Sequence, residues 1–182
     1  MQQLKKVSVV TNLIDSMQNH ESWCGETHIQ KALYFLQEFA GVPLGFNFIL
    51  YKHGPFSFDL RDELASMQAD RMLEVRIQPY PYGPSLQTTQ ASEELRKRFP
   101  VTLKKYARQI EFVGKHLGEL GVAELERIAT ALYVTKTIDE ADQRKRADKI
   151  CELKPHVDLG KALEAVVKLD EMYDEFRKIE IA

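Results

Sequence analysis

The stretch YKHGPFSFDLRDEL, residues 51–64, contains the side chains with the clearest potential for chemistry. They are Lys52, His53, Gly54 and Ser57. Residues of these types just before a helix can hold an anion, because the free N–H groups and the dipole of a helix N-terminus favour negative charge. A phosphate loop usually carries several glycines, whereas this stretch has one, and Pro55 after it has no N–H to offer. The pattern therefore favours a structural role for Gly54, Pro55 and Ser57 at the start of a helix.

The other reactive side chains are not spaced like a catalytic or metal site. The five histidines, His20, His28, His53, His116 and His156, include no HExxH pair. Cys24 and Cys151 lie far apart without CxxC spacing, so the sequence indicates neither a zinc knuckle nor a disulfide framework. No acid or base can be assigned to Ser57 or Cys24 as a partner in nucleophilic catalysis. We expect no catalytic residue, no metal ligand and no cofactor.

The charge of the whole chain gives no general attraction to nucleic acid or to membranes. Its 25 basic and 27 acidic residues leave a formal net charge of -2, so a polyanion would need a local basic surface. One basic group surrounds Pro100 with few acids between its members: Arg96, Lys97, Arg98, Lys104, Lys105 and Arg108. A second group, Arg144, Lys145, Arg146 and Lys149, is interleaved with acids and is typical of a solvated helix face.

The elements that must position these side chains can be predicted from periodicity. Apolar residues at three- and four-residue steps predict a helix over about 3–18 and a second one that ends at Gly41, a residue suited to a left-handed stop. Residues 46–51 are rich in aromatic and β-branched types and predict an extended segment. The pattern continues with a helix capped by Ser57, a half-buried strand at 73–77, a proline-rich turn at 79–84, a return strand at 85–88 and a helix capped by Thr89.

This order of elements predicts an α+β fold that is mainly α. Residues 1–100 match a winged-helix-like core, in which helices carry a small antiparallel β-hairpin wing. Residues 101–182 contain further helical stripes that need partners, so we expect a helical C-terminal layer packed on the core. With 182 residues and 44% apolar side chains, the two parts should form one compact unit.

The helix that would read DNA in a winged-helix protein has an unsuitable charge. Residues 57–71 carry four acids and two arginines, and residues 78–88 of the wing carry no charged residue, although Lys and Arg contacts to phosphate supply most non-specific DNA affinity. The tyrosines of the wing suit a protein contact as well as base stacking. We therefore favour protein recognition here, with Lys52, His53, Arg61, Tyr80 and Tyr82 as candidate partner-binding residues.

Several short motifs resemble those of a known group of proteins. Lys31, Leu33, Tyr34, Phe35 and Gln37, followed by Tyr51, Gly54, Pro55 and Ser57, are similar to a K-x-L-Y-F-x-Q-like helix and a Y-x-x-GP-x-S turn. The segments ELERIATALYV (124–134) and LKPH (153–156) resemble downstream signatures of the same group. The chain thus resembles the YwgA-like uncharacterised prokaryotic family, which is related to Panacea (SocA-like antitoxin) domain proteins. The resemblance implies a binding role in a toxin–antitoxin setting, in which the domain neutralises a toxin and delivers it to a protease, without implying catalytic residues.

Two hypotheses about function follow. The first is a non-enzymatic protein-interaction module, antitoxin- or adaptor-like, whose partner is another protein. The alternative is a winged-helix DNA-binding transcriptional regulator that uses the basic group around Pro100. An enzyme with an anion site near His53 is a third hypothesis. The N-terminus lacks the apolar core of a signal peptide, and no apolar run approaches the roughly 20 residues of a membrane helix, so we expect a cytoplasmic protein with no membrane contact.

Overall fold

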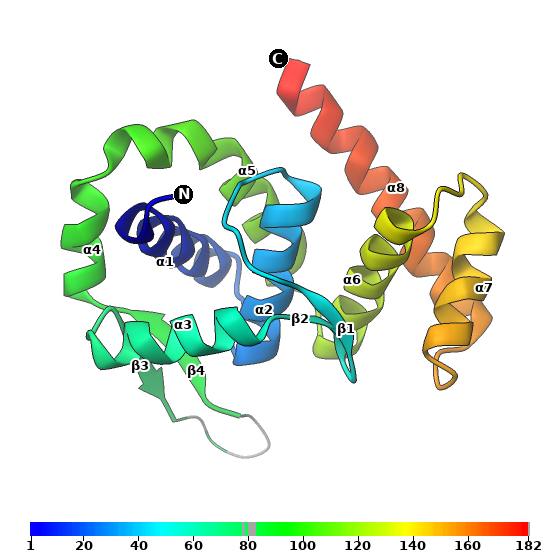
Figure 1. Cartoon of the computed structure of the whole chain (residues 1–182), viewed down its shortest axis with the longest axis horizontal. Coiled ribbons are helices and arrows are strands. Elements are labelled where there is room, and N and C mark those ends of the chain that lie inside the picture. The colour runs from blue at the N-terminus through cyan, green and yellow to red at the C-terminus, as the bar shows by residue number, and fades with distance from the viewer. Residues whose placement is uncertain (78, 80–82, 182) are drawn as a thin grey trace. The chain divides into compact units, whose positions relative to one another are not determined.

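The computed structural model describes residues 1–77, 79 and 83–181 (Figure 1). Over these residues the fold is mainly helical and contains two small two-stranded sheets, so the predicted class of α+β, mainly α, is confirmed. The chain forms two compact units. The first unit consists of Met1–Ile49 and Phe56–Leu120, and the second consists of Leu50–Pro55 and the chain from Gly121 onward.

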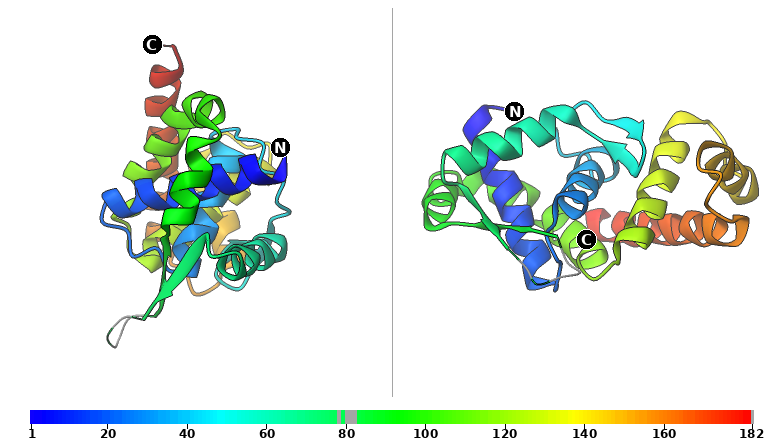
Figure 2. Two further views of the ribbon diagram at one scale, coloured as in Figure 1. Left: turned by 90° about the vertical axis from the view of Figure 1, so that its left-hand side faces the viewer. Right: turned by 90° about the horizontal axis from the view of Figure 1, so that it is seen from below.

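The first unit is built around its N-terminal helix. Its elements are α1 (Gln3–Asn19), α2 (Glu26–Tyr34), the π-helical turn η1 (Phe35–Phe39), α3 (Phe58–Ala69), β3 (Leu73–Arg76), β4 (Ser85–Thr88), α4 (Gln90–Lys97) and α5 (Pro100–Gly118). Helix α1 packs against α2, α4, α5 and β4, as Figures 1 and 2 show. Because partners cover α1 on several sides, its buried residues are not confined to one stripe: Val7, Ser8, Val9, Val10, Thr11, Leu13, Ile14, Ser16 and Met17.

The predicted helix starts and stops are confirmed by their hydrogen bonds and torsion angles. The Ser57 hydroxyl accepts a hydrogen bond from the Leu60 N–H at 3.2 Å and caps α3. Thr89 caps α4 and forms a reciprocal capping box with Ser92. Gly41 has a φ of 71°, in the left-handed region that ends a helix readily. These local signals fix where α3 and α4 begin and where the helical segment of α2 and η1 ends.

The hairpin of β3 and β4 lies where the alternation predicted it, but one expectation about its burial is wrong. The strands pair antiparallel, with Leu73 opposite Thr88 and Val75 opposite Leu86. Leu73 is buried, whereas Val75 is 49% exposed and Ile77 is 88% exposed. Leu73 and Val75 lie two residues apart and so share one face of β3, but the packing of α3 on β3 buries only Leu73. Ile77 lies beyond the end of the strand. The order of α3, hairpin and α4 is as predicted, and membership of the winged-helix class stays a prediction.

The second unit combines three helices with the turn of a β-hairpin. The helices are α6 (Val122–Thr137), α7 (Gln143–Leu153) and α8 (Leu159–Ile181), and α8 packs on both of the others. The hairpin strands are β1 (Ile49–Tyr51) and β2 (Gly54–Phe56), and the turn residues between them belong to this unit. The core includes Leu125, Ile128, Ile150, Val166 and Leu169. Val122 and Leu153 lie at helix ends and are exposed.

Helix α5 belongs to the first unit, so the division of the chain falls after Leu120 and not near residue 100. The reason is a close approach between α5 and α1. A Cβ added at Gly114 would lie 2.2 Å from the Ser16 Oγ, and one added at Gly118 would lie 2.6 Å from the His20 carbonyl oxygen. Two glycines one turn apart therefore let α1 and α5 pack with their backbones near each other. The predicted packing of a C-terminal helical layer on the core stays a prediction.

Among residues 1–77, 79 and 83–181, no helix combines the length and the apolar character that crossing a membrane requires.

Candidate functional site

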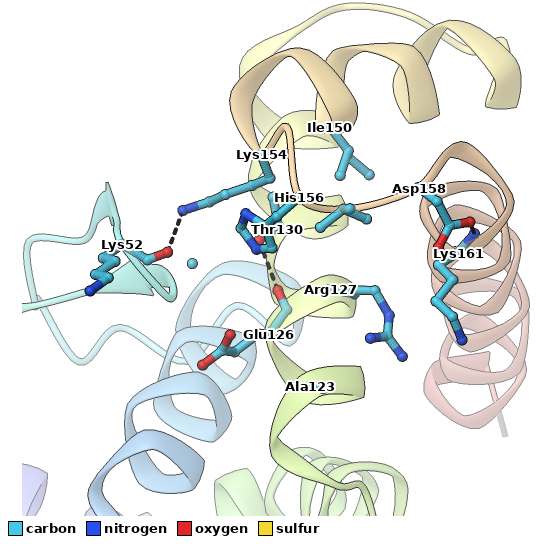
Figure 3. Close-up of a pocket in the computed structure, with 12 residues that line it drawn as sticks. Lys52, Ala123, Glu126, Arg127, Thr130, Ile150, Lys154, His156, Asp158 and Lys161 are labelled. Carbon is cyan, nitrogen blue, oxygen red and sulfur yellow. Dashed lines mark hydrogen bonds between the residues drawn. The ribbon is translucent and has the colours of Figure 1, made fainter.

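A pocket of about 160 Å³ lies within the second unit and brings together charged residues from distant parts of the chain (Figure 3). Its walls come from the β1–β2 hairpin, from α6, from α7 and its connection to α8, and from the first turn of α8. We call it the basic pocket. Two residues of the opening stretch, Lys52 and Gly54, line it, whereas Ser57 does not.

The β1–β2 turn is held at the basic pocket by a lysine from the end of α7. Lys154 Nζ donates hydrogen bonds to the carbonyl oxygens of Tyr51 and Lys52, the latter at 2.8 Å. Burial lowers the pKa of Lys154, and the negative charge of Glu126 partly opposes that effect. Gly54 has a φ of 86°, which favours glycine over any residue with a Cβ. The backbone conformation of Gly54 and the hydrogen bonds from Lys154 thus fix the position of the turn.

The charges that line the basic pocket are predominantly positive. The lining residues include Lys52, Arg127, Lys154 and Lys161, together with His156. Two acids also line it. Glu126 lies 3.3 Å from the imidazole of His53, and Asp158 accepts a hydrogen bond from the Lys161 backbone N–H at 3.0 Å and so caps the first turn of α8. Arg127 and Lys161 extend from α6 and α8 at the same side of the pocket (Figure 3). This arrangement can bind an anion electrostatically.

A nucleophilic role for the pocket hydroxyl finds no support in the contacts. The Thr130 hydroxyl donates to the Glu126 carbonyl oxygen of its own helix at 2.7 Å. The Cys24 thiol, in the first unit, is buried, and burial raises its pKa to about 11, so it stays protonated at neutral pH. Within the part of the chain that the structure describes, no three His, Cys, Asp or Glu side chains gather as a metal site.

A second surface, in the first unit, joins α3 to the β3–β4 hairpin. It is a groove of about 250 Å³, here called the α3 groove. Its apolar lining comes from Leu64, Ala65, Val75, Pro84 and Leu86, and its polar edge from Glu26, Arg61 and Gln68. The exposed Val75 side chain of β3 forms part of one wall of this groove.

The charged residues of α3 are largely engaged with one another and with α1. Arg61 donates to the Asp62 carboxylate at 2.8 and 3.0 Å and lies over the Phe58 ring. Glu63 is paired with Lys6 at 3.6 Å, and Asp59 accepts from the Asn47 side chain at 2.7 Å. Arg61 therefore borders the α3 groove with its charge partly satisfied. Tyr80 and Tyr82, the other wing candidates, lie outside the described residues.

The basic group around Pro100 is only partly available on the surface. Arg96 forms an ion pair with Asp15 of α1, and its side chain is 12% exposed, so it connects α4 to α1 and is not available to a ligand. The remaining five, Lys97, Arg98, Lys104, Lys105 and Arg108, are exposed on the end of α4 and the first half of α5.

One prediction about the second basic group is wrong. Arg146 was expected on a solvated face, but its side chain is 5% exposed and binds Asp170 of α8 with two hydrogen bonds, at 2.9 and 2.6 Å. Periodicity could not show this, because Arg146 lies on the face of α7 that α8 covers. Its neighbours behave as expected, since Arg144 pairs with Asp148 and Lys145 pairs with Glu140 on the surface.

Reasoning from sequence missed most of the basic pocket. Arg127, Lys154, His156 and Lys161 were not candidates, because more than seventy residues separate them from Lys52 and no motif connects them. The signal nearest to them was the LKPH segment, which contains Lys154 and His156 but was noted only for its resemblance. No protein-family model matches the chain, and a search of curated proteins finds no sequence match.

Proposed function

We propose that the protein is a non-enzymatic protein-interaction module, antitoxin- or adaptor-like, and that it belongs with the YwgA-like proteins and their Panacea relatives. The observation that carries the proposal is the α3 groove. It is an apolar depression whose lining includes Val75, a side chain that is 49% exposed. Exposed apolar surface of this kind, edged by polar groups, is characteristic of protein contacts.

The charges around the groove favour a polypeptide over DNA as the occupant. Asp59 and Asp62 are exposed on α3, and Glu74 is exposed on β3. Carboxylates at these positions repel phosphates, and Arg61 is already paired with Asp62. A partner that fits would bring an apolar side chain into the groove and basic residues against α3. A cationic segment of a small toxic protein has this chemistry, which agrees with the resemblance to antitoxin domains.

The proposal is tested with one charged substitution in the groove. Val75→Asp places a carboxylate among Leu64, Ala65 and Leu86, where an apolar partner would have to cover it. Affinity capture from the native host identifies the partner, which is then purified and titrated against both proteins. We expect Val75→Asp to raise the dissociation constant by at least about tenfold. Unchanged affinity for every captured partner would remove the groove from the contact surface.

Val101→Asp is the matched control. Val101 is 81% exposed and lies among the basic residues of α4 and α5, in the same unit as the groove. The protein-interaction proposal expects this variant to bind the partner like the wild type. A third variant, Tyr82→Ala, tests the predicted contribution of the wing tyrosine in the same titration.

The alternative is a DNA-binding transcriptional regulator. The observation that favours it is the group of five exposed basic residues on α4 and α5. A mobility shift with duplex DNA at increasing salt separates the two functions, because DNA binding through these residues weakens steeply as salt rises. If the protein is a DNA-binding regulator, Val101→Asp should reduce the mobility shift of the duplex and Val75→Asp should not. Absence of any shift at low salt removes the regulator.

A further inference from the structure

We propose that the basic pocket of the second unit binds a dianionic phosphate group, either free phosphate or the terminal phosphate of a small phosphate monoester. This inference is independent of the proposed protein contact, because it rests on residues 50–55 and 121–161 and uses none of the α3 groove.

The balance of charge in the basic pocket suits a dianion. Four basic residues line it, namely Lys52, Arg127, Lys154 and Lys161, against the acidic residues Glu126 and Asp158. The excess of two positive charges matches the charge of about -2 on a phosphate monoester near neutral pH. A carboxylate, or the single charge of a phosphodiester in nucleic acid, would leave part of the excess uncompensated.

Three of the pocket cations differ from most other basic residues of the second unit. In the same unit, Arg144, Lys145, Arg146, Lys149, Lys168 and Arg177 each form an ion pair with a carboxylate. Among the residues that the structure describes, Lys52, Arg127 and Lys161 form no such pair through their side chains. Arg127 is only partly exposed, so its guanidinium is held near the pocket without a counter-charge. This pattern is expected of side chains whose counter-charge is a ligand.

The two acids of the basic pocket contact groups other than the charged ends of its lysines and arginine. Asp158 accepts from the backbone N–H of Lys161 at the start of α8, and Glu126 faces His53 at 3.3 Å. Lys154 donates to two carbonyl oxygens of the β1–β2 turn and so positions Lys52 as a wall of the pocket. The Arg127 guanidinium lies beside Lys161, on the side of the pocket away from Lys52 (Figure 3). A planar guanidinium can donate two parallel hydrogen bonds to the oxygens of a phosphate.

The size of the pocket agrees with this ligand. A volume of about 160 Å³ corresponds to roughly five water molecules at about 30 Å³ each, which is enough for a phosphate head group. Ala123, Ile150 and Val157 form the apolar part of the lining, against which the carbon portion of a monoester can pack. The pocket therefore offers basic residues to the phosphate group of a monoester and apolar residues to its carbon portion.

The test is a titration of the full chain followed by NMR amide shifts or calorimetry, at constant ionic strength held with chloride. The probes are inorganic phosphate, phenyl phosphate and acetate. We expect saturable binding of one or both phosphates and weaker binding of acetate. Saturation with inorganic phosphate alone identifies the free ion as the ligand, whereas tighter binding of phenyl phosphate identifies a monoester.

Three variants locate the binding. Arg127→Gln and Lys161→Gln each remove one pocket charge, and we expect each to weaken phosphate binding by about tenfold. Lys178→Gln is the control, because it removes one charge from an exposed position on the same helix as Lys161, outside the pocket. We expect it to bind phosphate like the wild type. Absence of saturable binding by the wild type, equal binding of acetate, or equal weakening by Lys178→Gln would overturn the proposal.

Discussion

Gln30 of α2 binds the backbone of Ser57 through both ends of its amide. Its Nε2 donates to the Ser57 carbonyl oxygen and its Oε1 accepts from the Ser57 N–H, each at 3.0 Å, and both residues are buried. Gln37, two turns further along the same helical segment, holds Phe46 in the same way at 2.9 Å. The irregular chain between α2 and α3 thus obtains from side chains the hydrogen bonds that a sheet would otherwise supply.

The contact between Gln30 and Ser57 should contribute strongly to stability. Gln30→Leu replaces the amide with an apolar side chain of similar size and leaves the buried N–H and carbonyl of Ser57 without partners. We expect the free energy of unfolding to fall by about 3 kcal/mol, measured by urea denaturation. Gln90→Ala, at an exposed position of α4, is the control and should change it by less than about 0.5 kcal/mol. Equal effects of the two substitutions would contradict the prediction.

The Ser57 side chain should act only as a helix cap. Ser57→Ala removes the acceptor for the Leu60 N–H, and we expect the free energy of unfolding to fall by about 1 kcal/mol in thermal or urea denaturation. Because Ser57 does not line the basic pocket, phosphate binding should be unchanged in the same variant. A variant with normal stability and lost phosphate binding would show that the anion interpretation of this serine was the correct one.

The glycine contact between α1 and α5 should be sensitive to a single methyl group. Gly114→Ala places a Cβ against Ser16, and we expect a loss of about 2 kcal/mol in the free energy of unfolding. Ser16→Ala in the Gly114→Ala background removes the nearest clashing atom and should restore part of the loss, which a double-mutant cycle measures.

Gly83→Ala is the control for this cycle, since a Cβ there meets no atom within 4 Å. Strictly additive effects of the Ser16 and Gly114 substitutions would contradict the proposed contact.

The ion pair between Arg146 and Asp170 should make stability depend on acid pH. Burial raises the pKa of Asp170, but hydrogen bonds from Arg146 and Gln143 and the charge of Arg146 outweigh that effect and hold the pKa below its ordinary value of 3.8. The unfolded chain therefore binds the proton more readily than the folded one. The stabilisation is fully present above the unfolded pKa and is lost as pH falls through the folded pKa.

We expect Asp170→Asn to lower the free energy of unfolding by about 2 kcal/mol at pH 7. The difference from the wild type should shrink as the pH of urea denaturation is lowered from about 5 towards 3. Glu171→Gln, which changes a neighbouring exposed acid on α8, is the control. A difference that stays constant across this range would show that Asp170 does not titrate as described.

The amino-acid sequence by itself determined the features that depend on near neighbours in the chain. Ser57 and Thr89 mark their helix starts because a side-chain oxygen reaches an N–H three residues on, whatever the rest of the fold does. The alternation around Val75 placed the strand, and the mainly helical class followed from the apolar periods.

Only the tertiary structure decided which of those elements cover one another. Alternation predicted that Val75 shares the half-buried face of β3 with Leu73, yet Val75 is 49% exposed, because its burial depends on how far α3 extends over that face. The charge of Arg146 gave no sign of its burial, because its partner Asp170 lies on another helix. The basic pocket has the same origin: no local pattern distinguishes Lys52, Arg127 and Lys161 in the chain, and they become one site because the fold brings the β1–β2 turn, α6 and the start of α8 to one pocket. Contacts between residues far apart in sequence leave no local pattern, so periodicity and capping rules cannot predict them.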